Sequence, residues 1–250
     1  MMKLFLTIAV LLMGAYSCMA AGNYNDLWQK GDAFYSQKQY DSAAACFEQI
    51  AALKPRNAAV YFNLGNAYYR LNRVAPAVLN YERALKINPD YTEARENLAL
   101  AQGRISNAIP PTGNIFFVAW WHSLTRPDRA TTWAIVALSI FTLVCLLMLV
   151  RRLQKSARGL IPSQLTGFLF FAFLCFLALA FFASSNVAPH TAVVMQADTP
   201  LMKPDLKGKP IILVPEGTTV KIESENGLWA EVTLPDGRSG WLQETLIDKI

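Results

Sequence analysis

Two long apolar runs without a charged residue constrain this chain more than any other feature. They cover residues 132–150 and 165–183. As α-helices with a rise of about 1.5 Å per residue, each reaches roughly 28 Å, close to the thickness of a bilayer's hydrocarbon core. The rest of the chain offers no partner apolar enough to bury both runs in a soluble core. We therefore predict two transmembrane helices at these positions.

The segment between the two runs sets the expected topology. Residues 151–164 carry Arg151, Arg152, Lys155 and Arg158 and no acidic residue, whereas the outer flanks are poorer in positive charge. Because positive loops stay on the cytoplasmic side, this loop is predicted to be cytoplasmic. Both outer portions of a protein in the bacterial inner membrane would then lie in the periplasm.

The segment 1–20 is typical of a secretory signal peptide. It has one positive charge at Lys3, an apolar core over residues 4–13 and small residues after it. We expect cleavage after Ala20. The alternative is a lipoprotein, in which Cys18 would carry the lipid; either route exports the segment that follows.

Residues 24–91 repeat themselves with a period of 34. In each unit a glycine and small alanines allow two helices to approach, aromatic residues fill the gap, and a proline ends the second helix. Residues 92–106 continue the register for one helix, so 24–106 is predicted to be all-α, with two repeats and a capping helix. The matched pairs are Trp28/Phe62, Gly31/Gly65, Ala33/Ala67, Phe34/Tyr68, Ala43/Ala77, Phe47/Tyr81, Leu53/Ile87 and Pro55/Pro89.

This pattern resembles the tetratricopeptide repeat. The second unit matches it as Tyr61-x2-Leu64-Gly65-x2-Tyr68, followed by Ala77-x3-Tyr81 and Pro89, and the first unit departs at Lys30, which stands where the second has Leu64. The resemblance implies that the first helix of each unit lines a concave face that binds a peptide.

Turn-spaced residues on those first helices are the candidate partner contacts. An amide can bond an extended peptide backbone, aromatic rings supply apolar area, and Arg70 can pair with an acid. For Trp28 and Phe62 the alternative is packing between the helices. The family's clamp for a terminal carboxylate needs basic residues where this chain has Trp28, Glu93 and Asn97, which argues against such a ligand. The candidates are Trp28, Asp32, Tyr35, Phe62, Asn66, Tyr69 and Arg70.

Residues 190–250 are predicted to form a small all-β barrel. Strands are expected at 191–195, 211–214, 218–224, 228–233 and 238–242, with turns centred on Gly217, Gly227 and Gly237. The runs V-P-E-G-T-T-V-K-I, L-W-A-E-V and D-G-R-S-G-W-L resemble the bacterial SH3 domain. That resemblance implies binding of cell-wall peptides or protein segments. Trp229 and Trp241 are the candidate contacts, or else they pack in the barrel core.

The linker at 107–131 joins the repeats to the first apolar run. Its prolines at 110–111 break it from the upstream helices. The aromatic stretch at 115–121 is too short to span a bilayer, and its paired tryptophans favour the headgroup region.

Composition argues against several function classes. The two histidines, His122 and His190, have no spaced acid or cysteine partner, the four cysteines show no C-x-x-C spacing, and no glycine-rich phosphate loop is present. We therefore expect no enzyme activity, cofactor or metal. The net charge of +5 is concentrated beside the apolar runs, which argues against nucleic-acid binding. Neither run holds an ionisable residue, so the two helices are predicted to anchor rather than transport.

The whole domain order resembles the BatE family of the Bacteroides aerotolerance system. The resemblance implies partners with von Willebrand factor A domains and a role in assembling an inner-membrane complex for stress tolerance. The expected function is thus a membrane-integral scaffold. The alternative is a protein that binds peptidoglycan through its SH3-like domain.

Overall fold

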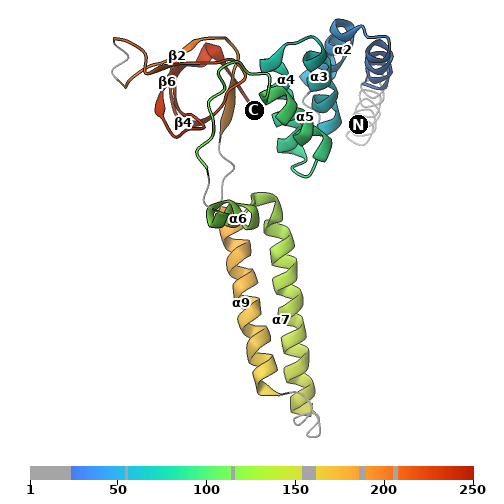
Figure 1. Ribbon diagram of the computed structural model, residues 1–250. Helices are drawn as coiled ribbons and strands as arrows, with labels where there is room; N and C mark the ends of the chain where they lie inside the picture. The colour runs from blue at the N-terminus through green and yellow to red at the C-terminus, as the bar shows by residue number, and fades with distance from the viewer. Residues whose placement is uncertain (1–23, 54–55, 114–115, 154–161, 186–189, 205–207) are drawn as a thin grey trace, which may run out of the picture. The chain divides into compact units, whose positions relative to one another are not determined.

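The computed structural model describes residues 24–53, 56–113, 116–153, 162–185, 190–204 and 208–250. These residues form two compact units, one of residues up to 112 together with 190–250, and one of residues 113–189 (Figure 1). We call them the repeat–strand unit and the apolar unit. The predicted signal peptide, Cys18 and most of the basic loop lie outside the described residues.

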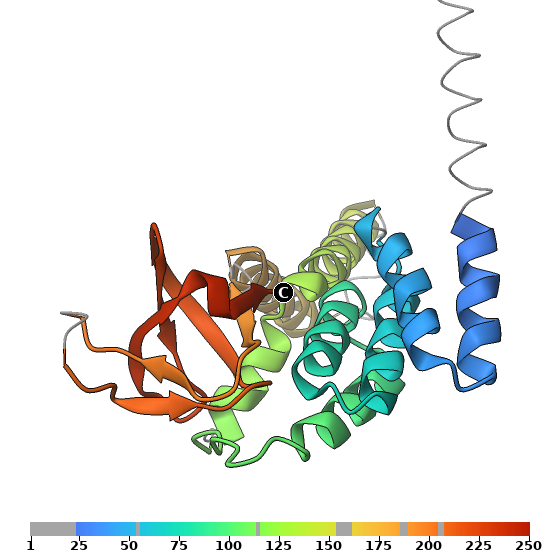
Figure 2. The ribbon, with the colours of Figure 1, turned by 90° about the horizontal axis from the view of Figure 1, so that it is seen from above.

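The first half of the repeat–strand unit consists of antiparallel helix pairs, which confirms the predicted all-α repeats. Seen from above, the helices follow one another in chain order as a single array (Figure 2). Lys38 and Asn72, one period apart, adopt left-handed φ values of 62° and 59° and end the first helix of each pair. The helices are residues 24–36, α2 (Tyr40–Ala52), α3 (Ala58–Arg70), α4 (Val74–Ile87) and α5 (Thr92–Gln102).

Two glycines allow a ring from the neighbouring helix to lie directly on the backbone. A Cβ atom on Gly31 would come within 2.9 Å of the Phe47 ring, and one on Gly65 within 2.8 Å of the Tyr81 ring. Both aromatic side chains are fully buried. The close approach of the paired helices therefore depends on these positions, as the period of the repeat predicts.

Residues 190–250, here called the strand domain, form antiparallel strands. Within the described residues, one sheet has the order β6-β5-β4-β1-β7, and β2 pairs with β3 in a second. Two short strands, β2 and β7, were not predicted from the sequence. The strands are β1 (Thr191–Val194), β2 (Thr199–Leu201), β3 (Ile212–Val214), β4 (Thr219–Asn226), β5 (Trp229–Thr233), β6 (Ser239–Gln243) and β7 (Ile247–Lys249).

The strand domain packs against helix α4 of the repeats. Val193 of β1 is fully buried in the hydrophobic cluster of the second repeat. Arg83 donates to Asp248 Oδ1 at 3.1 Å and to the Lys249 carbonyl at 2.8 Å. Ile109, which follows the capping helix, packs against the core of the strand domain. These contacts join what the sequence presents as two separate domains into one unit.

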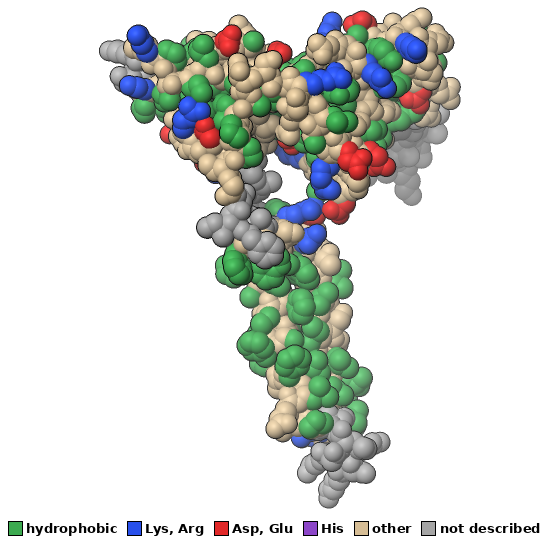
Figure 3. Space-filling model, viewed as in Figure 1, with side chains coloured by type: hydrophobic (Ala, Val, Ile, Leu, Met, Phe, Trp, Pro, Cys, Tyr) green, Lys and Arg blue, Asp and Glu red, His purple; other side chains and the backbone are tan. Residues whose placement is uncertain are grey.

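The apolar unit contains a short aromatic helix and two long helices. It comprises α6 (Phe116–Leu124), a 3-10 turn η1 (Pro127–Arg129), α7 (Ala130–Leu153) and α9 (Ser163–Ser185). Two helical segments are long and apolar enough to cross a membrane, judged by length and composition. They are Pro127–Leu153, which combines η1 and α7, and α9. Most of their apolar side chains are exposed (Figure 3). Helix α7 extends past the predicted end at 150, so Arg151 and Arg152 lie in its last turn, where positive charge favours the helix dipole.

Aromatic contacts join the two long helices. Trp133 of α7 lies 5.7 Å from Phe176 of α9, measured between ring centroids, and Phe141 lies 5.2 Å from Phe173. The Trp133 indole also donates to the Leu124 carbonyl at 2.8 Å, which ties the end of α6 to α7. The two helices therefore form an antiparallel pair.

Candidate partner-binding face of the repeats

A hollow of about 300 Å³ lies between the first helices of the two repeats. Its walls come from the helix at 24–36 and from α3, with one ring from α2 behind them. The residues that line it are Asp32, Tyr35, Ser36, Phe47, Asn63 and Asn66. Three of the predicted contacts, Asp32, Tyr35 and Asn66, therefore lie at one site.

Helical spacing places the polar residues on the same side. Asp32 is followed at i+3 and i+4 by Tyr35 and Ser36, and Asn63 is followed at i+3 by Asn66. Ser36 Oγ donates to the Asp32 carbonyl at 2.8 Å. The Tyr35 ring is half-buried against Tyr40, with 5.2 Å between ring centroids. The Asp32 carboxylate remains exposed to solvent.

A hydrogen-bond network fixes the amide of Asn66. Its Oδ1 accepts from the Tyr81 hydroxyl and from Asn97 Nδ2, both at 2.8 Å. Burial raises the pKa of Tyr81, so its hydroxyl stays protonated and continues to donate at neutral pH. With two donors on the oxygen, the chemistry left to Asn66 is donation from its NH2 group. That group can bond a peptide carbonyl, in keeping with the predicted contact to an extended backbone.

Arg70 and Tyr69 are neighbours in sequence but differ in their exposure to solvent. The Arg70 guanidinium is exposed, and the Tyr35 hydroxyl, as its hydrogen-bond partner, raises the pKa of Arg70. The Tyr69 ring is half-buried, and the Arg104 guanidinium lies over it, 3.7 Å from the ring centroid. Arg104 also donates to the Tyr69 carbonyl at 3.2 Å. Tyr69 does not line the hollow, and Arg104 lies over its ring.

Trp28 and Phe62 take the packing alternative that the sequence left open. Trp28 lies 5.7 Å from Phe47 in an edge-to-face contact and stacks on Tyr24 at 6.2 Å. Phe62 lies 4.9 Å from Tyr91 and also packs toward Tyr81. Both rings fill space between helices and do not line the hollow.

The sequence prediction missed Asn63 and Ser36 as contacts of the hollow. A signal for Asn63 was present, since it precedes Asn66 by about one helical turn and Asn97 by one full period of the repeat. Residues that repeat with the period of the array occupy equivalent places on successive first helices. A signal for Ser36 was present as well, because it follows Asp32 by one helical turn and precedes Arg70 by one full period of the repeat.

Trp229 and Trp241 lie on the outer face of the strand domain, not in its core. Both are half-buried, and along β5 and β6 they alternate with buried residues such as Val232 and Leu242. Trp241 pairs across the strands with Glu231, two residues from Trp229, so the two rings share one face. Neither ring belongs to the buried core cluster of the strand domain.

The described residues hold no group of three histidine, cysteine, aspartate or glutamate side chains arranged to bind a metal ion. Of the cysteines described, Cys46 is buried among the repeat helices, and this burial raises the pKa of its thiol. Cys145 and Cys175 are exposed on α7 and α9.

Comparison with protein families identifies the class of module that carries the hollow. Residues 31–72 match a model described as TPR repeat, and residues 58–91 match the model of the tetratricopeptide repeat. The two overlapping matches cover the second pair of helices and most of the first. The chain therefore contains tetratricopeptide repeats, a module that mediates protein–protein interaction and is typically non-enzymatic.

Two curated relatives each match part of the chain. A stretch of 99 residues, 40% of the chain, is 29% identical to 16% of the peroxisomal targeting signal receptor of Saccharomyces cerevisiae. Another of 82 residues, 32% of the chain, is 33% identical to 14% of the protein STIP1 homolog of Dictyostelium discoideum. The chain thus spans less than a fifth of the length of these relatives.

Among solved structures, the first TPR of Spaghetti (RPAP3) bound to the HSP90 peptide SRMEEVD is similar to 33% of this chain. It has 28% sequence identity and a TM-score of 0.32, and 65% of that chain is covered. The Sgt2 TPR domain from Aspergillus fumigatus is 26% identical, with a TM-score of 0.31, over 32% of this chain and 53% of that one.

Proposed function

We propose that this protein is a membrane-anchored, non-enzymatic scaffold whose repeats bind an extended segment of a protein partner. The observation that carries the proposal is the hollow between the first helices of the two repeats. It combines the NH2 group of Asn66, held by two hydrogen bonds on its oxygen, with the exposed carboxylate of Asp32 and the ring of Tyr35. An extended peptide offers the backbone carbonyls and the side chains that such a surface binds.

The hollow is small, so the bound segment must be short. About 300 Å³ holds a few residues, and the row of first helices continues past α3 only with the capping helix α5. Exposed Arg70 adds a positive charge on the same helix as Asn66, whereas Asp32 adds a negative one on the neighbouring helix. A segment carrying both an acidic and a basic side chain would satisfy both.

The two long apolar helices support the membrane anchor. We propose that α7 and α9 cross the bacterial inner membrane with the basic loop in the cytoplasm. The repeats and the strand domain then lie together in the periplasm, as the signal-like leader also favours. Packing of the strand domain on α4 supports this arrangement, since domains in contact must share one side of a membrane.

We also propose that the chain belongs to a particular family of membrane scaffolds. Two repeats, two apolar helices and a strand domain with SH3-like sequence runs have the order of the BatE family. We propose that the partners are proteins with von Willebrand factor A domains, assembled into an inner-membrane complex for aerotolerance. Co-purification of such proteins with the tagged chain tests this identity directly.

A second candidate function is peptidoglycan binding by the strand domain. It is favoured by the half-buried pair Trp229 and Trp241 on one outer face, because partly exposed aromatic rings are suited to contact a ligand. Co-sedimentation of the full-length protein with purified peptidoglycan tests it, with Trp229→Ala as the matched variant. Retention that the substitution abolishes supports this candidate, and absence of retention rules it out.

The scaffold is tested by affinity purification of the tagged full-length protein from mildly solubilised membranes. A variant with Asp32→Ala, Tyr35→Ala and Asn63→Ala removes three side chains that line the hollow and leaves the hydrogen-bond network of Asn66 in place. Glu96→Ala, an exposed position on α5, is the control. We expect a defined protein partner to be lost from the triple variant and kept by the control. If the triple variant stays folded and keeps every partner, the repeats do not bind through this hollow.

A further inference from the structure

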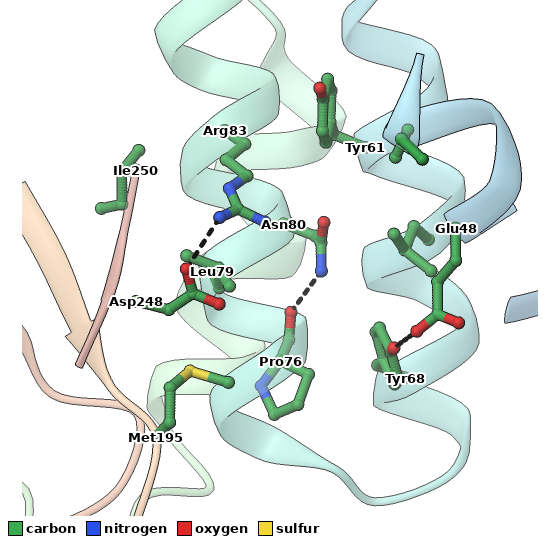
Figure 4. A pocket seen from close by; sticks show the side chains of 13 residues that line it. Glu48, Tyr61, Tyr68, Pro76, Leu79, Asn80, Arg83, Met195, Asp248 and Ile250 are labelled. Carbon is green, nitrogen blue, oxygen red and sulfur yellow. Dashed lines mark hydrogen bonds and ion pairs between the residues drawn. The ribbon is translucent and has the colours of Figure 1, made fainter. Parts of the chain in front are cut away.

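A second and larger hollow lies on the side of the repeats formed by their second helices. It has a volume of about 730 Å³, and Figure 4 shows it from close by. Helix α2 contributes Glu48, α3 contributes Tyr61, Leu64 and Tyr68, and α4 contributes Leu79 and Asn80. We call it the furrow. The predicted partner contacts on the first helices do not line it.

Asn80 has an unpartnered oxygen at this site. The residue is only 3% exposed, and its Oδ1 has no hydrogen-bond donor. Its Nδ2 donates to the Pro76 carbonyl at 2.8 Å, which fixes the orientation of the amide and turns the oxygen away from Pro76 (Figure 4). A flipped amide would set two oxygens against each other, so rotation does not relieve the oxygen. A buried acceptor without a donor costs free energy, and a ligand that supplies the donor removes that cost.

Two other side chains of the furrow already donate hydrogen bonds to acceptors within the protein. The Tyr68 hydroxyl donates to the Glu48 carboxylate, and burial raises the pKa of Tyr68, so this donation persists at neutral pH. Arg83 donates to Asp248 and to the Lys249 carbonyl. A carboxylate accepts about four hydrogen bonds, so Glu48 has capacity beyond its bond from Tyr68.

The charges that line the furrow also favour a ligand that donates hydrogen bonds. Arg83 and Asp248 pair at 3.1 Å and cancel, which leaves the negative charge of Glu48. The surface between the polar groups is apolar, with Leu64 and Leu79 on the repeat helices. The furrow thus suits a positively charged donor on an aliphatic stem.

We propose that the furrow binds a lysine or arginine side chain of a protein partner, with its charged head group between Asn80 and Glu48. The aliphatic stem then lies along Leu64 and Leu79. Since water does not reach the Asn80 oxygen, the head group has to displace a neighbouring side chain as it enters. Half-buried Tyr61 is one of the side chains that line the furrow. This site adds a second point of attachment to the hollow on the first helices.

The test is an NMR titration of the full-length protein in detergent micelles, labelled with 15N at asparagine only. The probe is an acetylated, amidated pentapeptide of alanine with lysine or arginine at its centre. Its counterpart has norleucine, which keeps the stem and loses the charge. Loss of one side-chain signal in Asn80→Leu assigns Asn80. We expect that signal to shift saturably with the lysine or arginine peptide and to stay unchanged with the norleucine peptide.

Two variants separate binding from folding. Glu48→Gln is expected to weaken the peptide at least tenfold, while Glu96→Gln on α5 leaves the affinity unchanged. Asn80→Leu removes the unpartnered oxygen, so it should keep or raise the melting temperature and abolish the peptide's effect on it. The proposal is overturned if the Asn80 signal does not move, if the norleucine peptide binds equally, or if Asn80→Leu melts lower and still binds. Spermidine binding as tightly as the peptides would identify a free polyamine, and not a partner's side chain, as the ligand.

Discussion

Replacing Gly65 by alanine tests how the repeat helices are held together. A Cβ atom at this position would lie 2.8 Å from two carbon atoms of the Tyr81 ring, closer than any van der Waals contact allows. The ring has no exposed surface, and its hydroxyl is bonded to Asn66 Oδ1 at 2.8 Å. The ring therefore cannot move aside without breaking that bond or displacing its neighbours.

The expected cost follows from two opposing effects. Overpacking a buried site costs about 1–3 kcal/mol, and the immobile Tyr81 ring places Gly65→Ala toward the upper end. Alanine regains about 1 kcal/mol over glycine inside a helix. The net loss in free energy of unfolding is about 1–2 kcal/mol. For a unit of this size, each kcal/mol lowers the melting temperature by about 2–4 °C.

Thermal unfolding of the full-length protein in detergent, followed by far-ultraviolet circular dichroism, measures this loss. Gly103→Ala is the matched control, because that residue has a helical φ of −63° and its added Cβ would meet nothing closer than 3.4 Å. We expect Gly103→Ala to keep or raise the melting temperature while Gly65→Ala lowers it. If both variants melt higher than the wild type, the ring is not held against Gly65 and the packing argument fails.

Three further predictions concern the strand domain and its contact with the repeats. Burial raises the pKa of Glu82, beside Thr219, so the folded protein holds this proton more tightly and loses stability as pH rises above the ordinary glutamate range. Glu82→Gln should thus raise the melting temperature at neutral pH and flatten the pH dependence between mildly acidic and neutral pH; an unchanged slope would contradict the burial. Trp241→Ala should cost about 1–2 kcal/mol in urea unfolding, below the roughly 3–5 kcal/mol of a fully buried aromatic residue, and a larger loss would place it in the core. Ile109→Ala should lower the free energy of unfolding by about 1–2 kcal/mol, since this linker residue packs on the strand-domain core; no change would mean that the linker is loose.

The repeats were predictable from the sequence because their packing is local and periodic. Gly31 with Phe47 and Gly65 with Tyr81 recur at the same spacing, and the structure brings both pairs into contact. The two apolar helices were predictable for a similar reason, since a run of uncharged residues is visible without knowledge of its partners.

The rest depends on contacts between distant segments. In the sequence Val193 is an ordinary apolar strand residue. Nothing in the adjacent sequence indicates that its side chain packs into the second repeat. Arg104, which follows the capping helix, lies over the Tyr69 ring, and nothing near either residue in the sequence indicates this contact. Strands β2 and β7 are too short for alternation to mark them.

Site-specific photo-crosslinking in intact cells tests the central claim most directly. A photoreactive residue at Tyr35 lies in the hollow between the first helices, and one at Gln49, exposed on α2, serves as the control. The scaffold account predicts a discrete protein adduct from position 35 that is absent from position 49. No adduct at position 35, or the same adducts at both positions, would contradict it.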